Sequence, residues 1–135
     1  MAYWLLKSEP FKYSWDQMVK DGRTHWDGVR NHQAAANLKA MQVGDRAFFY
    51  HSNEGKEIVG VVEIVRTAYP DPSDEAGRFV IVDVAPICPV KRPITLAEMK
   101  ADPSLADLAL IRQSRLSVVP VSDAHWQIIA EQAGL

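Results

Sequence analysis

Several polar and aromatic residues have the side chains that a pocket for one nucleobase requires. A base outside a stack needs an aromatic face, fixed donors and acceptors for its edge, and a cation near its phosphate. Trp26 and Tyr50 can supply faces. The residues that can read the edge carry hydroxyl, carboxylate or amide groups: Ser8, Glu9, Asn31 and Ser52. Together these residue types can supply the groups that a base-binding pocket needs.

Further residues extend the predicted pocket and supply its charge. Gly28 lets backbone approach a ligand closely, because glycine has no side chain. Lys7, Arg30 and Arg115 can hold the phosphate next to the bound base. The remaining pocket candidates are Val29, His51 and Ser117.

Most of these residues also have a purely structural interpretation. Trp26 can cover the core beneath a loop, and Asn31 is a good helix N-cap. Glu9 and Arg30 can form an ion pair, with Arg115 closing the network across the protein. One residue can serve both purposes, so the sequence leaves these interpretations open.

A hydrolase site is another interpretation of the His51-Ser52 pair, with Asp45 as a conceivable orienting carboxylate. No Gly-x-Ser-x-Gly motif surrounds the serine, which argues against it. The four histidines lack the paired spacing of metal ligands, and Cys88 is the only cysteine. We therefore expect no catalytic residue, no metal and no cofactor.

Composition limits the class of protein. The chain has 135 residues, of which 47% are hydrophobic and 24% are charged, so we expect a single globular domain over residues 1–135. Its formal net charge is −2, so contacts with a polyanion must be local. A lone cysteine and the lack of a signal or membrane segment predict a cytoplasmic location and no membrane partner. We expect a monomer.

Capping patterns predict the helices. The first three patterns are Ser14 with Gln17 for a helix over residues 14–20, Asn31 for a helix that ends near residue 43, and Thr95 with Glu98. A short helical segment over residues 104–111 and a terminal helix capped at Ser122 follow. The segment between the first two helices, residues 24–30, has no apolar periodicity and is expected to be a loop.

Short apolar and β-branched runs predict strands over residues 3–6, 47–52, 58–65, 80–84 and 116–121. The run over residues 58–65 is apolar at successive positions, which indicates a curved or covered sheet. We therefore predict an α+β fold: a small mixed β-barrel with short helices inserted between its strands.

Four segments together resemble the EVE domain family: residues 3–10, 26–31, 41–52 and 115–118. The most specific parts of this resemblance are Lys-Ser-Glu-Pro at residues 7–10 and Trp-Asp-Gly-Val-Arg-Asn at residues 26–31. The resemblance runs in order along nearly the whole chain. It implies a PUA-like mixed barrel, similar also to YTH and ASCH domains, with a pocket for a modified base in DNA or RNA.

Three functions follow from these patterns. The resemblance favours a non-catalytic module whose partner is a nucleic acid carrying a modified base, with a modified cytosine flipped into the pocket. The alternative is a small amidohydrolase acting on modified nucleosides, because the related ASCH group uses a lysine and a carboxylate that Lys7 and Glu9 can imitate. A peptide-binding groove is the third hypothesis, and the polar residues of the loops argue against it.

Overall fold

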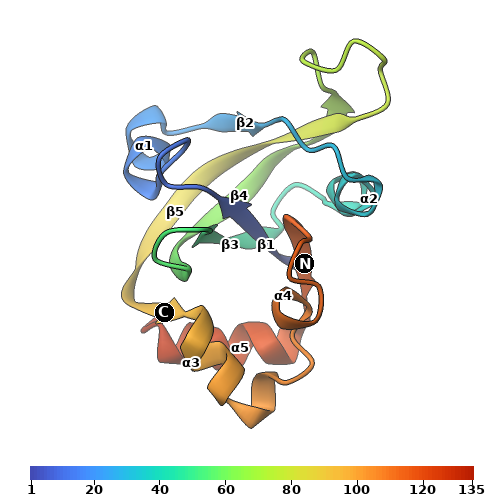
Figure 1. Ribbon diagram of the computed structural model, residues 1–135. Helices are drawn as coiled ribbons and strands as arrows, with labels where there is room; N and C mark the ends of the chain where they lie inside the picture. The colour runs from blue at the N-terminus through green and yellow to red at the C-terminus, as the bar shows by residue number, and fades with distance from the viewer.

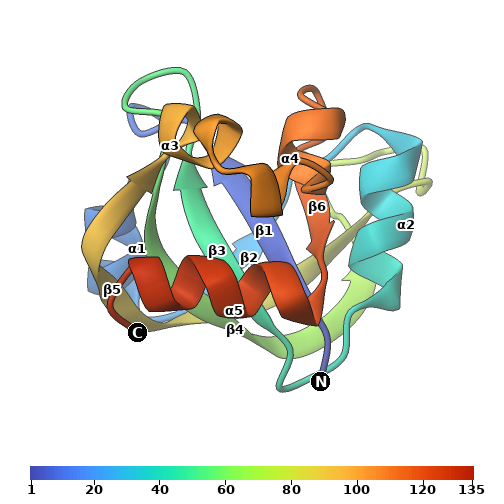
Figure 2. The same ribbon diagram turned by 90° about the horizontal axis from the view of Figure 1, so that it is seen from below.

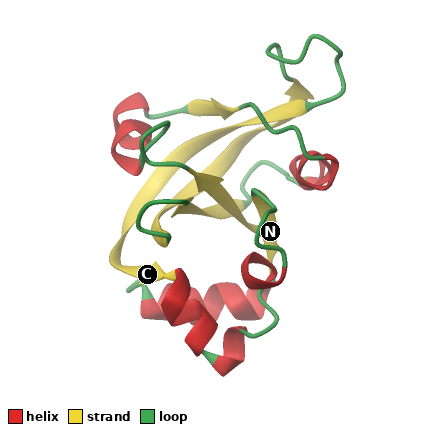
Figure 3. Ribbon diagram, viewed as in Figure 1, coloured by secondary structure: helices red, strands yellow, loops and turns green.

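One mixed β-sheet forms the centre of the computed structural model, which describes residues 1–135. Its six strands are β1 (Tyr3–Ser8), β2 (Thr24–Trp26), β3 (Arg46–His51), β4 (Glu57–Pro70), β5 (Val80–Thr95) and β6 (Val118–Val121). They lie in the order β2-β5-β4-β3-β1-β6 (Figures 1 and 3). The predicted α+β class is confirmed. Closure into a barrel is not confirmed, because the edge strands β2 and β6 do not pair with each other.

Helices are inserted between the strands, as predicted. They are α1 (Trp15–Asp21), α2 (His32–Ala40), α3 (Leu96–Ala101), the 3₁₀ turn η1 (Pro103–Leu105), α4 (Ala109–Arg112) and α5 (Asp123–Gln132). In Figure 1, α3, α4 and α5 gather below the sheet, while α1 and α2 lie on opposite sides of it. None of the helices is long and apolar enough to cross a lipid bilayer.

Side-chain caps begin the main helices where the sequence predicts them. The side chains of Ser14, Asn31 and Ser122 each accept a hydrogen bond from the N–H group three residues later, at 3.1, 2.9 and 3.2 Å. Thr95 and Glu98 form the reciprocal capping box. These caps are local interactions, so a local pattern is enough to predict them.

Three local predictions are wrong in detail. The expected loop over residues 24–30 begins with β2, which is too short to show a strand's alternation. The expected helix over residues 104–111 is divided, because Asp102 caps a 3₁₀ turn and the backbone of Leu108 is not helical. The expected strand over residues 80–84 continues to Thr95.

Both faces of the central strands are covered by aromatic residues. Successive residues of a strand point to opposite faces. Phe48 stacks on Trp126 of α5, with ring centres 3.8 Å apart, and Figure 2 shows α5 lying across this face of the sheet. Phe49 meets the rings of Trp15 and Trp26 edge-on at 5.5 and 5.6 Å. The predicted covering of the sheet is therefore confirmed.

The strands β1 and β3 are the one parallel pair in an otherwise antiparallel sheet. The buried Asp45 connects their starts by accepting hydrogen bonds from the Ala2 and Gln42 N–H groups and the Trp4 indole, each at 3.0 Å. Burial alone raises the pKa of this carboxyl, but the three hydrogen bonds outweigh burial and lower it. Asp45 thus has structural partners at the start of β3, whereas His51 lies at the other end of this strand. This position contradicts the suggested role of Asp45 in a hydrolase site.

Gly60 of β4 is a point of close packing. A Cβ atom at this residue would lie 2.5 Å from the Trp15 ring, far inside van der Waals contact. The ring of Trp15 is 8% exposed and rests directly on the strand. The tryptophan can cover this face of the sheet only because residue 60 has no side chain.

We expect Gly60→Ala to lower the free energy of unfolding by about 1–3 kcal/mol, because the new methyl group displaces Trp15. Equilibrium denaturation in urea measures the loss. A second substitution, Trp15→Leu, removes the clashing ring, so the double variant should lose less than the sum of the two single losses. Additive losses would show that Trp15 is not the obstacle.

Candidate functional site

A cavity of about 970 Å³ opens at the edge of the sheet where β1 and β3 end. Their parallel register places Lys7 opposite Tyr50 and Ser8 opposite His51. Figure 2 shows α3, α4 and the turn after β3 gathered at this edge. The wall combines residues from five segments: 7–13, 24–28, 50–56, 96–100 and 110–117.

Most of the predicted pocket residues line this one cavity. They are Lys7, Ser8, Glu9, Trp26, Gly28, Tyr50, Ser52, Arg115 and Ser117. The structure therefore brings together the ends of β1 and β3 with the segment that follows β2, as the sequence predicts. Contact between each of these residues and a ligand stays a prediction.

The other four candidates do not line the cavity and have structural partners. Asn31 caps α2, and Val29 is 7% exposed within the core. His51 Nε2 accepts a hydrogen bond from the Trp15 N–H at 3.1 Å, and burial lowers the pKa of its ring. Arg30 binds the loop between β4 and β5, as described below.

Glu9 and Arg30 do not form the suggested ion pair. The Glu9 carboxylate instead accepts a hydrogen bond from the Asn53 amide at 2.6 Å and lies 3.3 Å from Lys12 Nζ. Asn53 belongs to the turn after β3, so this bond joins the two loops at the cavity. The side chain of Glu9 is 27% exposed, which leaves part of the carboxylate accessible.

Trp26 and Tyr50 present polar groups to the cavity more than open faces. Their exposed fractions are 9% and 3%. Trp26 packs edge-on against Tyr13 and Phe49, with ring centres 6.3 and 5.6 Å apart. Neither the indole N–H nor the Tyr50 hydroxyl has a partner within the protein, and no buried side-chain polar atom lacks one. Both groups are therefore accessible to solvent, and both residues line the cavity.

The half-buried Tyr13 is an aromatic wall residue that the sequence analysis missed. Burial and the hydrogen bond from its hydroxyl to Asp21, at 2.8 Å, raise its pKa to about 12. The sequence could have indicated Tyr13 by its position four residues after Glu9, because one tight turn brings both residues to the cavity.

The cavity wall carries more cations than carboxylates. Its carboxylates are Glu9 and Asp27, and its cations are Lys7, Lys12, Lys56, Lys100 and Arg115. Lys7 Nζ donates to the Ser114 carbonyl at 2.9 Å, and burial lowers the pKa of this amine. Lys12, Lys56 and Lys100 were missed because they are isolated in the sequence and meet only in the folded chain. No group of three or more His, Cys, Asp or Glu side chains is arranged to hold a metal ion.

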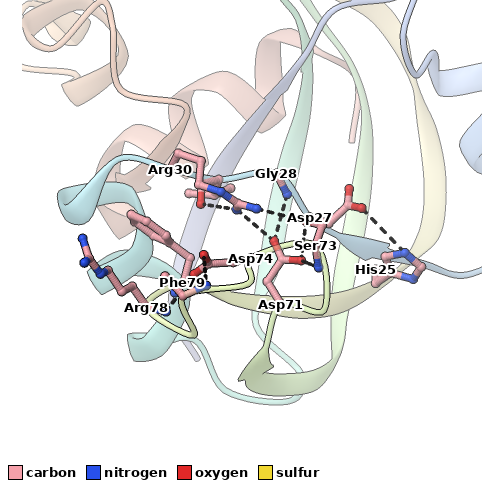
Figure 4. A network of polar contacts seen from close by, with 11 residues as sticks. His25, Asp27, Gly28, Arg30, Asp71, Ser73, Asp74, Arg78 and Phe79 are labelled. Atoms are coloured by element: carbon pink, nitrogen blue, oxygen red, sulfur yellow. Dashed lines mark hydrogen bonds and ion pairs between the residues drawn. The ribbon is translucent and has the colours of Figure 1, made fainter.

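The buried Asp71 fixes the backbone of Gly28 at the cavity wall (Figure 4). Its carboxylate accepts hydrogen bonds from the Gly28 N–H at 3.1 Å and Arg30 Nη1 at 3.0 Å, and from the N–H and hydroxyl of Ser73 at 2.8 and 2.6 Å. The Arg30 guanidinium also lies 5.4 Å from the centre of the Phe79 ring. Gly28 has a φ of +76°, which favours glycine. The loop between β4 and β5 thus holds one wall of the cavity.

The chain is similar to several known proteins. A family model described as the EVE domain matches residues 2–132. Human thymocyte nuclear protein 1 is 33% identical over 162 aligned positions, which cover 95% of this chain and 72% of that protein. An NMR structure of a protein from Rhodopseudomonas palustris is 56% identical, with a TM-score of 0.94 over 99% of this chain and 94% of that one.

Two further solved structures are similar to this chain. A structure of human thymocyte nuclear protein 1 (THYN1) in complex with DNA containing 5-methylcytosine is 32% identical, with a TM-score of 0.92 over 100% of this chain and 99% of that one. An ASCH protein from Zymomonas mobilis is 11% identical, with a TM-score of 0.60 over 97% of this chain and 98% of that one. The second likeness is one of fold alone.

We expect Asp71→Asn to lower the free energy of unfolding at neutral pH by about 1–3 kcal/mol, because an amide accepts hydrogen bonds from charged groups less strongly than a carboxylate does. Burial raises the pKa of the Asp71 carboxyl, but the bonds from Ser73, Arg30 and Gly28 outweigh it and hold the pKa at about 2. An unfolded aspartate titrates near about 3.9. The contribution is therefore complete above that pH and is lost as the pH falls toward about 2.

Chemical denaturation across this pH range measures the difference between the wild type and the Asn variant. The gap in unfolding free energy should close as the pH falls. A gap that stays constant down to the lowest pH would show that the Asp71 carboxyl is not held ionised by these bonds.

Proposed function

Because the chain belongs to the EVE domain family, we propose that it binds a modified cytosine of DNA, flipped out of its strand into the cavity, without changing it chemically. The observation that supports this most directly is the human THYN1 structure with 5-methylcytosine-containing DNA, which is similar over the whole chain. A cavity of about 970 Å³ is large enough for one nucleotide.

The polar groups of the cavity suit the edge of cytosine. The exocyclic amine of this base is a donor, and the accessible part of the Glu9 carboxylate can accept from it. The Trp26 indole N–H and the Tyr50 hydroxyl can donate to the carbonyl oxygen and ring nitrogen. Asn53 and Lys12 hold Glu9 in place, so the carboxylate is oriented before a ligand arrives.

The cations of the wall provide the local positive charge that a phosphate backbone requires. Lys56, Lys100 and Arg115 come from three separate segments around the cavity and are exposed. A second hollow of about 350 Å³ shares Arg115 and Ser114 with the first, and Arg112 also lines it. A strand entering the cavity can pass along this surface. DNA is the favoured partner because of the THYN1 complex, and binding to RNA stays a prediction.

Two groups that an amidohydrolase would use are already engaged. Lys7 Nζ donates to the Ser114 carbonyl, and Glu9 is bound to Asn53 and Lys12. The likeness to an ASCH protein is one of fold at 11% identity and supports no shared activity. We therefore favour binding over catalysis.

Other aspects of the proposal rest on the family and the sequence. We propose that residues 1–135 form one EVE domain of PUA-like architecture that acts as a monomer; the family match extends over residues 2–132. The cytoplasmic location stays a prediction, and the curated relatives bear the name thymocyte nuclear protein.

We expect Glu9→Gln to narrow the preference of the protein for 5-methylcytosine over thymine by about 1–3 kcal/mol. The two bases share the methyl group and differ in the exocyclic group that Glu9 reads. Affinities for otherwise identical oligonucleotides measure the preference. Glu54→Gln, in the same turn as Asn53 but outside the cavity wall, is the matched control. An unchanged preference in the Glu9 variant would exclude this contact.

We expect purified protein to leave acylated cytidine chemically unchanged, because Lys7 and Glu9 are held by other residues. Chromatography of the nucleoside after prolonged incubation provides the measurement. Repeated turnover that Lys7→Ala or Glu9→Ala abolishes would replace the proposed function with that of an amidohydrolase.

A further inference from the structure

Phe11 is the only aromatic residue among the exposed large hydrophobic side chains, and 68% of it is exposed. Single exposed apolar residues are common on proteins, so exposure alone carries no weight. The position of Phe11 is what distinguishes it. It lies in the turn between β1 and α1, where Glu9, Lys12 and Tyr13 all line the cavity. Lys12 Nζ lies 5.9 Å from the centre of the Phe11 ring, so the ring is close to the cavity wall.

The turn that carries Phe11 is held firmly by hydrogen bonds. The N–H groups of Lys12 and Tyr13 both donate to the Glu9 carbonyl, at 3.0 and 2.9 Å. The Ser8 hydroxyl donates to the Tyr13 carbonyl, and the Glu9 side chain is bound to Asn53 of the neighbouring turn. A rigid turn therefore presents an aromatic ring to solvent beside the cavity. Such preorganisation lowers the entropy cost of binding.

Removal of a base from a duplex leaves a gap in the stack. Proteins that deform DNA insert apolar side chains between base steps, and an aromatic ring restores stacking contacts. We propose that Phe11 inserts into double-stranded DNA at the place from which the modified cytosine is flipped, while Lys12 contacts the adjacent phosphate. Lys12 is suited to this contact because its side chain is 70% exposed. This inference rests on the proposed function, and it adds that Phe11 contributes to binding only when the DNA is double-stranded.

The test compares a short duplex carrying one 5-methylcytosine with the same modified strand alone. Phe11→Ala should weaken binding to the duplex roughly 5- to 150-fold, which corresponds to the loss of one stacked aromatic ring. Binding to the single strand should hardly change, because a single strand has no gap to fill. Phe11→Trp should keep the duplex affinity. Fluorescence of 2-aminopurine placed next to the methylcytosine reports unstacking, and at saturating protein its rise on binding should be larger with Phe11→Ala, because no ring then stacks on the neighbouring base.

Val43→Ala is the matched control. Val43 is 64% exposed and precedes the start of β3, at the end of the sheet opposite the cavity. The control should bind both probes as the wild type does, and circular dichroism confirms that each variant is folded.

Three results would overturn the inference. Equal losses for the duplex and the single strand would show that Phe11 stacks on a flanking base and fills no gap. If Phe11→Ala binds the duplex as tightly as the wild type does, and the wild type still binds the modified single strand, the role of Phe11 is rejected and the proposed function stands. A wild type that binds neither probe would reject both.

Discussion

The parallel pairing of β1 with β3 is the constraint on which the candidate site depends. A parallel pair brings the carboxyl ends of both strands to one edge of the sheet, whereas antiparallel neighbours separate them. Lys7 and Ser8 therefore open onto the same cavity as Tyr50 and Ser52. Parallel strands also need a long crossover connection. Here that connection carries α1, β2 and α2, and its residues supply two further parts of the cavity wall.

The residues of one segment have two different structural roles. Within residues 26–31, the first three line the cavity, whereas Arg30 and Asn31 hold the frame through Asp71 and the cap of α2. The loop between β4 and β5 does not line the cavity, but it supports the cavity wall because the Asp71 carboxylate accepts a hydrogen bond from the Gly28 N–H. Neighbouring residues of this segment thus either line the cavity or hold the surrounding frame.

The sequence predicted what depends on neighbours along the chain. Caps, most strand positions and the family resemblance follow from local residue types. The extent of β5 could not be predicted, because prolines lack the N–H donor of a strand and yet Pro86 and Pro89 are paired with β4 at its register shifts. The suggested ion pair between Glu9 and Arg30 was wrong, because opposite charges in two separate motifs do not establish that the two side chains lie close together. The lysines of the cavity wall were missed for the same reason: only the fold brings Lys12, Lys56 and Lys100 together.

The position of β1 also affects how the chain folds during synthesis. β1 lies between β3 and β6, and Tyr3 stacks on Trp126 of α5 with ring centres 4.2 Å apart. β1 is therefore synthesised first, whereas its neighbour β6 and the covering helix α5 are synthesised last. Such contacts between distant parts of the sequence give a high contact order, which slows folding. Until the C-terminal elements leave the ribosome, one edge of β1 stays open to pairing with other nascent chains.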